Sequence, residues 1–188
     1  MTRKVQVHFN VGATGELSLR VSLATLARVL FKHPRTGQKM LALERKATLD
    51  RSTGETIIEM KSQPFGGAIR IKDIDEVQRV VGDFHFDSAR SRLEQDFRIF
   101  IRPSSWPRLR DFAIEHLRHG LDPILETGPE RELIEEFEDA LQIHLDTEQF
   151  TCQPLGLVLE DHPSPTMNVG ARGFPSVRIY SVHEVKIT

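Results

Sequence analysis

Acidic side chains follow one face of residues 129–145, a segment whose apolar spacing predicts a helix. At about 100° per residue, carboxylates fall on one side and apolar side chains on the other. The acidic face holds Glu132, Glu135, Glu136 and Asp139, and the apolar face holds Leu133, Ile134, Phe137, Ala140 and Leu141. Carboxylates gathered in this way suit a hard cation such as Mg²⁺, which takes oxygen ligands. A solvated surface helix has the same pattern, so the acidic face alone leaves both interpretations open.

Alternating and helical patterns predict the elements that position this helix. Two-residue alternation over residues 4–32 indicates strands, and Gly12 and Gly15 interrupt them. A hairpin is expected from residues 26–33 and 39–45 around a turn at 34–38, followed by a polar connection over 46–54. Further strands are expected at residues 55–61, 67–71, 95–102, 153–160 and 176–187, with a loop over 162–175.

Two more helices are expected upstream of the acidic one. Residues 73–81 form a short helix that Asp73 or Asp75 caps, and residues 104–119 form a longer one with Ser105 as its N-cap. Together the patterns predict an α+β fold with a mixed sheet and helices inserted late in the chain.

The hexapeptide Arg131-Glu132-Leu133-Ile134-Glu135-Glu136 resembles the core of the Nudix box, and the chain is similar in order to the Nudix hydrolase superfamily. The segment SQPFGGAIRI resembles the strand with a glycine pair that normally leads into the box, and FPSVRIYSVHEV resembles a late sheet strand. The resemblance implies a single Nudix-like domain over residues 1–188. Its mixed β-sheet would be sandwiched by helices, with a helix–strand–helix insertion at about residues 73–127.

The sequence departs from the family pattern at three places. Glu130 stands two residues before Glu132 instead of the usual nine. About 60 residues, rather than a short loop, separate Gly67 from the box helix. Glu138 stands where the family has a glycine after the glutamate pair, so the helix is expected to continue for another turn. These departures touch the residues that support catalysis and leave the Arg-Glu…Glu-Glu core intact.

The resemblance implies Mg²⁺- or Mn²⁺-dependent hydrolysis of a nucleoside diphosphate linked to another group. Glu132, Glu135 and Glu136 would be catalytic and would ligate the metal with the main chain near Gly66 or Gly67. Arg131 would orient a carboxylate. The expected substrate-binding residues are Arg45, Arg70 and Arg102, and the candidates for the base are Glu126, Glu130 and Asp139. The alternative is a catalytically inactive Nudix-like domain that binds a nucleotide or a partner protein.

A basic stretch in the insertion has two interpretations. Six arginines lie between residues 90 and 110, namely Arg90, Arg92, Arg98, Arg102, Arg108 and Arg110, against Glu94 and Asp96. Arginine forks suit phosphate, so the stretch is a candidate phosphate-binding lid. Solvated side chains, or salt bridges to the acidic helix, are the alternative.

Histidine and cysteine give weaker signals. His116 and His119 lie three residues apart on an expected helix, which permits a shared metal, but no third ligand is evident nearby. The one cysteine, Cys152, lies in a strand-like run and is expected to be a buried thiol rather than a nucleophile.

Composition limits the class of protein. The 188 residues suit one globular domain, with 39% hydrophobic and 28% charged residues. The formal net charge of -2 gives no global attraction to nucleic acid. No run approaches the roughly 20 apolar residues of a membrane span, and no signal peptide is evident, so a cytoplasmic location without membrane association is expected. The expected partner is a nucleotide-type small molecule, and an amphipathic insertion is compatible with a homodimer.

Overall fold

The computed structural model of the protein describes residues 17–50, 57–118, 120–166 and 171–187. The strand expected near residues 4–10, and His119, lie outside the described residues. Within them the fold is α+β with a mixed sheet, as the sequence patterns predict. It contains four α-helices, one more than the three that the sequence predicts.

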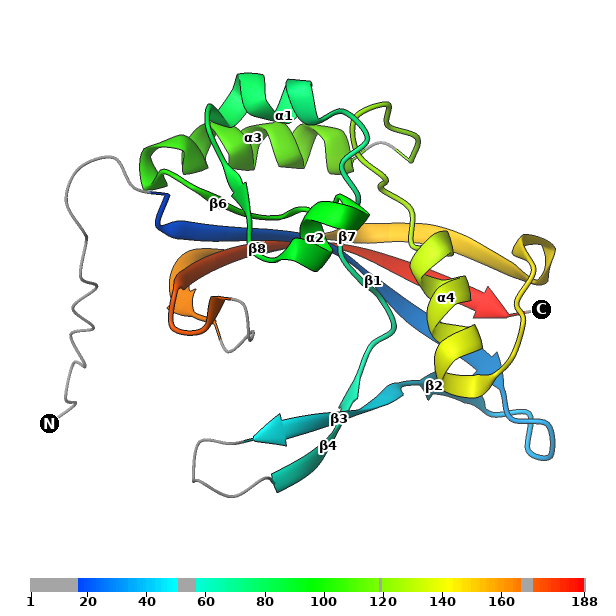
Figure 1. Ribbon diagram of the computed structural model, residues 1–188. Coiled ribbons are helices and arrows are strands. Elements are labelled where there is room, and N and C mark those ends of the chain that lie inside the picture. The colour runs from blue at the N-terminus through cyan, green and yellow to red at the C-terminus, as the bar shows by residue number, and fades with distance from the viewer. Residues whose placement is uncertain (1–16, 51–56, 119, 167–170, 188) are drawn as a thin grey trace, which may run out of the picture.

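The long first strand, β1 (Leu19–Lys32), organises the main sheet (Figure 1). The sheet order is β5-β6-β1-β8-β7, and β2 pairs with the far end of β1. β1 runs parallel to β8 and antiparallel to β6 and β2. The other strands of this sheet are β2 (Lys39–Ala42), β5 (His85–Phe86), β6 (Arg98–Ile101), β7 (Phe150–Pro165) and β8 (Pro175–Ile187). The expected hairpin around residues 34–38 is confirmed as the β1–β2 connection.

Helices cover one face of this sheet (Figure 1). α1 (Ile74–Val81) and α3 (Trp106–Leu117) pack over the alternate residues of β1, β6 and β8 that point to that side. The cluster includes Val21, Ile99 and Ile179, each 0% exposed. A short helix, α2 (Ala89–Glu94), follows β5, and the 3₁₀ turn η1 (Pro103–Ser105) precedes α3.

The acidic helix packs over a second apolar cluster at the other end of the sheet. α4 (Glu130–Leu141) buries Leu133 and Phe137 against Ala27 and Val185 of the central strands. The helix continues past Glu138, as expected, but it ends at Leu141, four residues before the predicted end at residue 145. Gln142 adopts a left-handed conformation, and the amide of Ile143 turns back to the carbonyl of Phe137. The short 3₁₀ turn η2 (Thr147–Gln149) then leads into β7.

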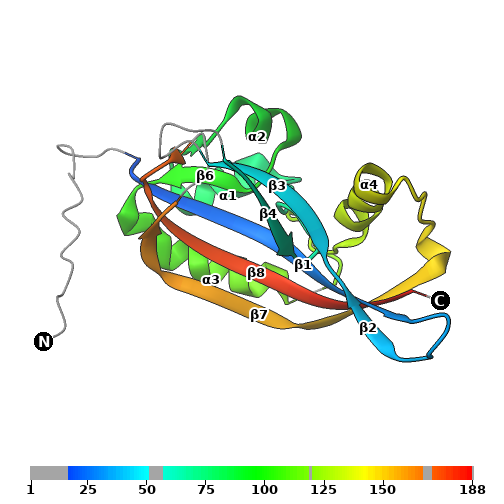
Figure 2. The ribbon, with the colours of Figure 1, turned by 90° about the horizontal axis from the view of Figure 1, so that it is seen from below.

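A two-stranded ribbon lies on the opposite side of the sheet from α1 and α3 (Figures 1 and 2). It consists of β3 (Glu44–Asp50) and β4 (Ile57–Gln63) in antiparallel register. The prediction of a polar connection over residues 46–54 was therefore wrong for its first part. Main-chain hydrogen bonds hold the two strands of such a ribbon together, so the strands need no alternation of apolar residues. For this reason the sequence pattern did not indicate β3.

Two local predictions hold only in part. Ser105 occupies the N-cap position of α3, but its side chain makes no capping hydrogen bond, because its hydroxyl donates to the carbonyl of Val81 instead. The loop expected from residue 162 begins later, because β7 continues to Pro165 as an edge strand with register shifts that accommodate its prolines. By contrast, Asp73 caps α1 as expected and accepts a hydrogen bond from the amide of Glu76 at 2.9 Å.

Within the described ranges, every helix is too short or too polar to traverse a lipid bilayer.

Candidate functional site

The acidic helix docks on the glycine pair that lies about 60 residues earlier in the chain. Its apolar face brings Leu133, which is 0% exposed, and Phe137 against the segment that contains the glycines. The rings of Phe65 and Phe137 lie 4.9 Å apart between their centroids. The carbonyl of Phe65 accepts from the amide of Ala27, which fixes this segment to β1. The fold thus closes the gap that the insertion opens in the sequence.

Two glutamates of α4 meet the two glycines directly. Oε2 of Glu136 accepts a hydrogen bond of 2.6 Å from the amide of Gly66. A Cβ added at Gly67 would lie 1.7 Å from Oε2 of Glu132, so that carboxylate rests on the Gly67 Cα. The carbonyl of Gly67 accepts from the amide of Thr25 at 2.9 Å. Both glutamates are therefore held beside the main chain of the glycine pair.

Arg131 joins the remaining carboxylates of the cluster. Its guanidinium lies 2.7 Å from Glu126 and from Glu132 and 3.1 Å from Glu135. Its Nη2 also donates to the carbonyl of Ala68 at 3.4 Å. Burial by itself lowers the pKa of Arg131, but its hydrogen bond to Glu126 and the surrounding negative charges raise that pKa overall. Arg131 thus remains charged and holds three carboxylates in fixed directions.

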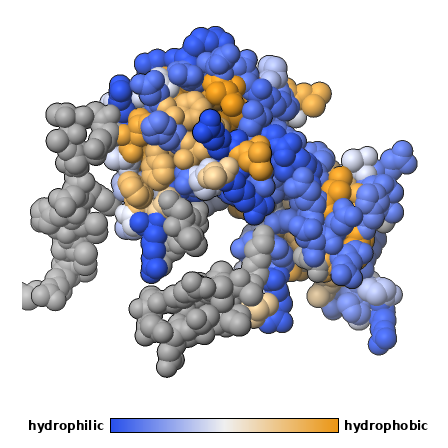
Figure 3. All heavy atoms as spheres, viewed as in Figure 1, coloured by the Kyte–Doolittle hydropathy of each residue, from blue (hydrophilic) through white to orange (hydrophobic). Residues whose placement is uncertain are grey.

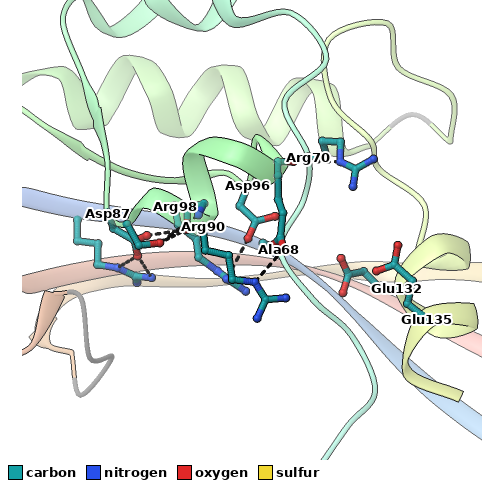
Figure 4. Close-up of polar contacts among 12 residues, drawn as sticks. Ala68, Arg70, Asp87, Arg90, Asp96, Arg98, Glu132 and Glu135 are labelled. Carbon is teal, nitrogen blue, oxygen red and sulfur yellow. Dashed lines mark hydrogen bonds and ion pairs between the residues drawn. The ribbon is translucent and has the colours of Figure 1, made fainter. Parts of the chain in front are cut away.

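Asp96 is a member of this neighbourhood that the sequence did not suggest. It is 4% exposed, and it precedes β6, where its backbone pairs with Arg70. Figure 4 shows it between the group of Asp87, Arg90 and Arg98 and the pair Glu132 and Glu135. Burial raises the pKa of Asp96, and the charge of Arg98 opposes the rise. Its position directly before a strongly apolar strand was the only signal in the sequence.

Burial also raises the pKa of Glu132, and the charges of Glu135 and Asp96 add to the rise although Arg131 opposes it. A carboxyl group whose pKa is higher in the folded than in the unfolded state stabilises the fold while it is protonated. Its contribution to the free energy of unfolding is complete below the unfolded pKa and is lost as the pH rises through the folded pKa. We therefore expect the stability of Glu132→Gln, relative to wild type, to increase as the pH rises above about 4.3, the pKa of an unfolded glutamate. Urea unfolding at several pH values measures it, with Glu138→Gln on the exposed side of α4 as the control. A pH-independent difference, or one of opposite sign, would contradict the assignment.

The three arginines expected to bind substrate lie in different places. Arg70 donates from Nε to the carbonyl of Glu94 at 3.1 Å, and it lies close to the acidic cluster in Figure 4. Arg102, at the end of β6, lies 3.6 Å from Asp83. Arg45 is exposed on β3, and its described contacts do not reach the glutamates of α4. Only Arg70 is thus placed beside the cluster.

The candidates for a base also differ in their surroundings. Glu126 pairs with Arg131, as above, and Asp139 is exposed on α4. The carboxylate of Glu130 lies against Gly128, where an added Cβ would meet it at 1.9 Å. Glu126 is therefore the candidate that the cluster itself contains. The surface between α2 and α4 is mostly hydrophilic, and hydrophobic and hydrophilic side chains both show on the visible side of α4 (Figure 3).

Cys152 is protected rather than reactive. Burial raises the pKa of its thiol to about 12, and the charge of Glu130 and the hydrogen bond that the thiol donates to that carboxylate contribute. Because the thiolate is the nucleophile, we expect iodoacetamide at pH 8 to alkylate native Cys152 at least ~100-fold more slowly than the urea-unfolded chain. Mass spectrometry of the single cysteine follows the reaction. Equal rates in the two states would show an activated thiol.

The metal pair that the spacing of His116 and His119 permits is not tested by the structure, since His119 lies outside the described residues. Nδ1 of His116 lies 2.6 Å from Oδ2 of Asp122. The other oxygen of Asp122 accepts from the amides of Ile124 and Leu125. This pair fastens the end of α3 to the connection that follows it.

The chemistry of the α4 cluster fits a hard divalent cation, because its donors are carboxylate oxygens beside a main-chain turn. Across residues 17–50, 57–118, 120–166 and 171–187, however, no three acidic, histidine or cysteine side chains are arranged to coordinate one ion. Glu132 and Glu135 face Arg131 instead. The donor types are therefore suitable, and their present directions are set by the arginine.

Comparison with known protein families, with curated proteins and with solved structures gives no match to this chain.

Proposed function

We propose that the protein is a Nudix-like, divalent-cation-dependent hydrolase of a nucleoside diphosphate linked to another group. The observation that carries the proposal is the docking of α4 on the glycine pair. Glu136 accepts from the amide of Gly66, and Glu132 rests on Gly67. The resemblance requires this juxtaposition, and 60 or so intervening residues give no local reason for it.

Each residue of the cluster has a role in this proposal. Glu132, Glu135 and Glu136, with the main chain at Gly67, would hold Mg²⁺ or Mn²⁺, which when bound neutralises pyrophosphate oxygens and activates a water. Gly66 orients Glu136 through its amide, and Arg131 orients Glu132 and Glu135. Glu126 lies at the edge of the same cluster and accepts the proton of the attacking water at its carboxylate. Arg70 contacts a phosphate of the substrate.

A second candidate function is binding of a nucleotide without turnover. Arg131 forms ion pairs with Glu126, Glu132 and Glu135 at once. This favours the second candidate, because the arginine already balances the negative charge of these carboxylates without a cation. In that case Arg131 would occupy the position at which the cation is needed. The two candidates share a ligand class and differ in cation binding.

Thermal unfolding with and without millimolar Mg²⁺ or Mn²⁺ tests the first function. Binding to the native state alone raises the melting temperature. We expect a rise for wild type and for Glu138→Gln/Asp139→Asn, whose side chains are exposed on the same helix, and none for Glu135→Gln/Glu136→Gln.

Phosphate release from a panel of linked nucleoside diphosphates then separates hydrolysis from binding. We expect turnover that requires the cation and that falls at least ~100-fold in Glu135→Gln/Glu136→Gln. Nucleotide binding without cation response or turnover would support the second candidate. A wild type that responds neither to cation nor to nucleotide would refute both.

A further inference from the structure

The face of the main sheet opposite the α1–α3 core carries three arginines on adjacent strands. Ser22 of β1 pairs in register with Arg98 of β6 on one side and with Arg178 of β8 on the other. Arg20 lies two residues before Ser22 on β1. Because residues at i and i+2 share a face, all three side chains leave the sheet on the side of Ser22, away from Val21 in the core. We call Arg20, Arg98 and Arg178 the arginine triangle.

The three arginines of the triangle surround a small residue, Ser22. Neighbouring strands lie about 4.8 Å apart, so the Cα atoms of Arg98 and Arg178 are about 10 Å apart across Ser22. Arg20 lies about 7 Å from Ser22 along β1. The small hydroxymethyl group of Ser22 is the only side chain between the two flanking arginines in that row. Guanidinium groups at these positions are able to converge on one small anion.

Arg20 lacks acceptors for most of its donors. Its side chain is 1% exposed, its Nε donates to Oδ2 of Asp87 at 2.9 Å, and its Nη2 lies 2.7 Å from the same oxygen. Neither Nη1 nor Nη2 has an aligned hydrogen-bond partner among the described residues. The other oxygen of Asp87 is taken by the hydroxyl of Ser91 at 2.7 Å. A buried guanidinium with one acceptor oxygen is costly, and a ligand oxygen would satisfy it.

The two flanking arginines keep donors for a ligand and are accessible to solvent. Nη1 of Arg98 donates to Asp96 at 3.0 Å, and Nη1 of Arg178 donates to Glu160 at 2.8 Å. In the described part of the chain, their Nη2 groups have no hydrogen-bond partner of their own. The side chains of Arg98 and Arg178 are 34% and 21% exposed. Burial lowers the pKa of Arg20, the hydrogen bond and the charge of Asp87 oppose that change, and the charges of Arg98 and Arg178 add to it.

We infer that the arginine triangle binds a phosphate or short polyphosphate group over Ser22. Planar guanidinium forks match the oxygens of phosphate and form charge-assisted hydrogen bonds to it. A bound phosphate supplies the acceptors that Nη1 and Nη2 of Arg20 lack. The site uses neither the glutamates of α4 nor a divalent cation, so it goes beyond the proposed function.

Calorimetric titration with inorganic tripolyphosphate, and separately with ATP, in the presence of EDTA tests this site. We expect wild type to bind and Arg178→Gln to bind at least 10-fold more weakly. The matched control is Arg28→Gln, which removes another cross-strand arginine of β1, paired with Glu184 at 2.6 Å on the same face. That variant is expected to bind like wild type. Equal affinity for the two ligands would assign recognition to the phosphate chain, and tighter ATP binding would extend the site to the nucleoside.

A second variant keeps all the charges. Ser22→Leu fills the centre of the triangle, and we expect it to abolish binding while circular dichroism shows a folded protein. The inference is overturned if wild type does not bind tripolyphosphate at millimolar concentration, if Arg28→Gln weakens binding as much as Arg178→Gln, or if folded Ser22→Leu binds like wild type. Because EDTA removes divalent cations, failure here would leave the cation tests of α4 unaffected.

Discussion

Gly66→Ala is expected to destabilise the protein by about 3–5 kcal/mol. Gly66 has a φ of 143°, a backbone conformation that residues with a Cβ rarely adopt. An added Cβ would also lie 2.1 Å from the carbonyl oxygen of Thr25, which is main chain of the central strand and cannot move aside. The substitution shifts the amide that holds Glu136, so any cation response should fall with stability. Urea unfolding measures the loss.

Gly156→Ala is the matched control for this prediction. Gly156 has a φ of 155°, and an added Cβ there would have nothing within 4 Å. It therefore isolates the backbone strain, at about 1–3 kcal/mol, from the collision with Thr25. Equal losses in the two variants would mean that the segment at Gly66 does not pack against β1 as described.

Arg131→Gln is expected to lower the free energy of unfolding by about 2 kcal/mol at neutral pH. Loss of one partner from a fully buried ion pair costs more, about 3–5 kcal/mol, but this cluster is partly solvated. The side chains of Arg131, Glu126 and Glu132 are 21%, 26% and 17% exposed. Without the guanidinium, the three carboxylates repel one another, and protonation relieves the repulsion. The loss should therefore shrink as the pH falls toward about 4.

Two comparisons make this result specific. Arg79→Gln removes an exposed partner of Glu76 on α1 and should change stability by no more than about 0.5 kcal/mol. Under the proposed function, Mg²⁺ should raise the melting temperature of Arg131→Gln more than that of wild type, because the arginine no longer competes for the carboxylates. If Arg131→Gln were as stable as wild type at neutral pH without cation, Arg131 would not be holding the cluster together.

The acidic cluster of α4 and the arginine triangle are connected through Asp96, whose carboxylate pairs with Arg98 and whose charge raises the pKa of Glu132. A substrate with a phosphate chain long enough to reach both would place one phosphate on the arginines and the scissile bond at the glutamates. The two proposals have separate tests, and each stands or falls without the other.

The sequence by itself determined the elements whose pattern is local. The apolar and acidic faces of α4, the alternation along β1 and the Asp73 cap of α1 depend on residues a few positions apart, so the printed sequence contains them. The resemblance also singled out the glycine pair and the glutamates before their contact was known. The end of α4 was misjudged because Leu145 leaves the helix to join the core, which is a tertiary contact.

Only the tertiary structure decided which distant residues meet. Asp96 lies near enough to Glu132 for its charge to raise the pKa of that group, and Arg131 donates to the carbonyl of Ala68, because β6 and the glycine segment both lie along β1. The arginine triangle depends on the registers of β1 with β6 and with β8, and a shift of one residue would turn a strand's side chains to the other face. Registers between strands far apart in sequence follow from chain topology and core packing, and no local pattern encodes them.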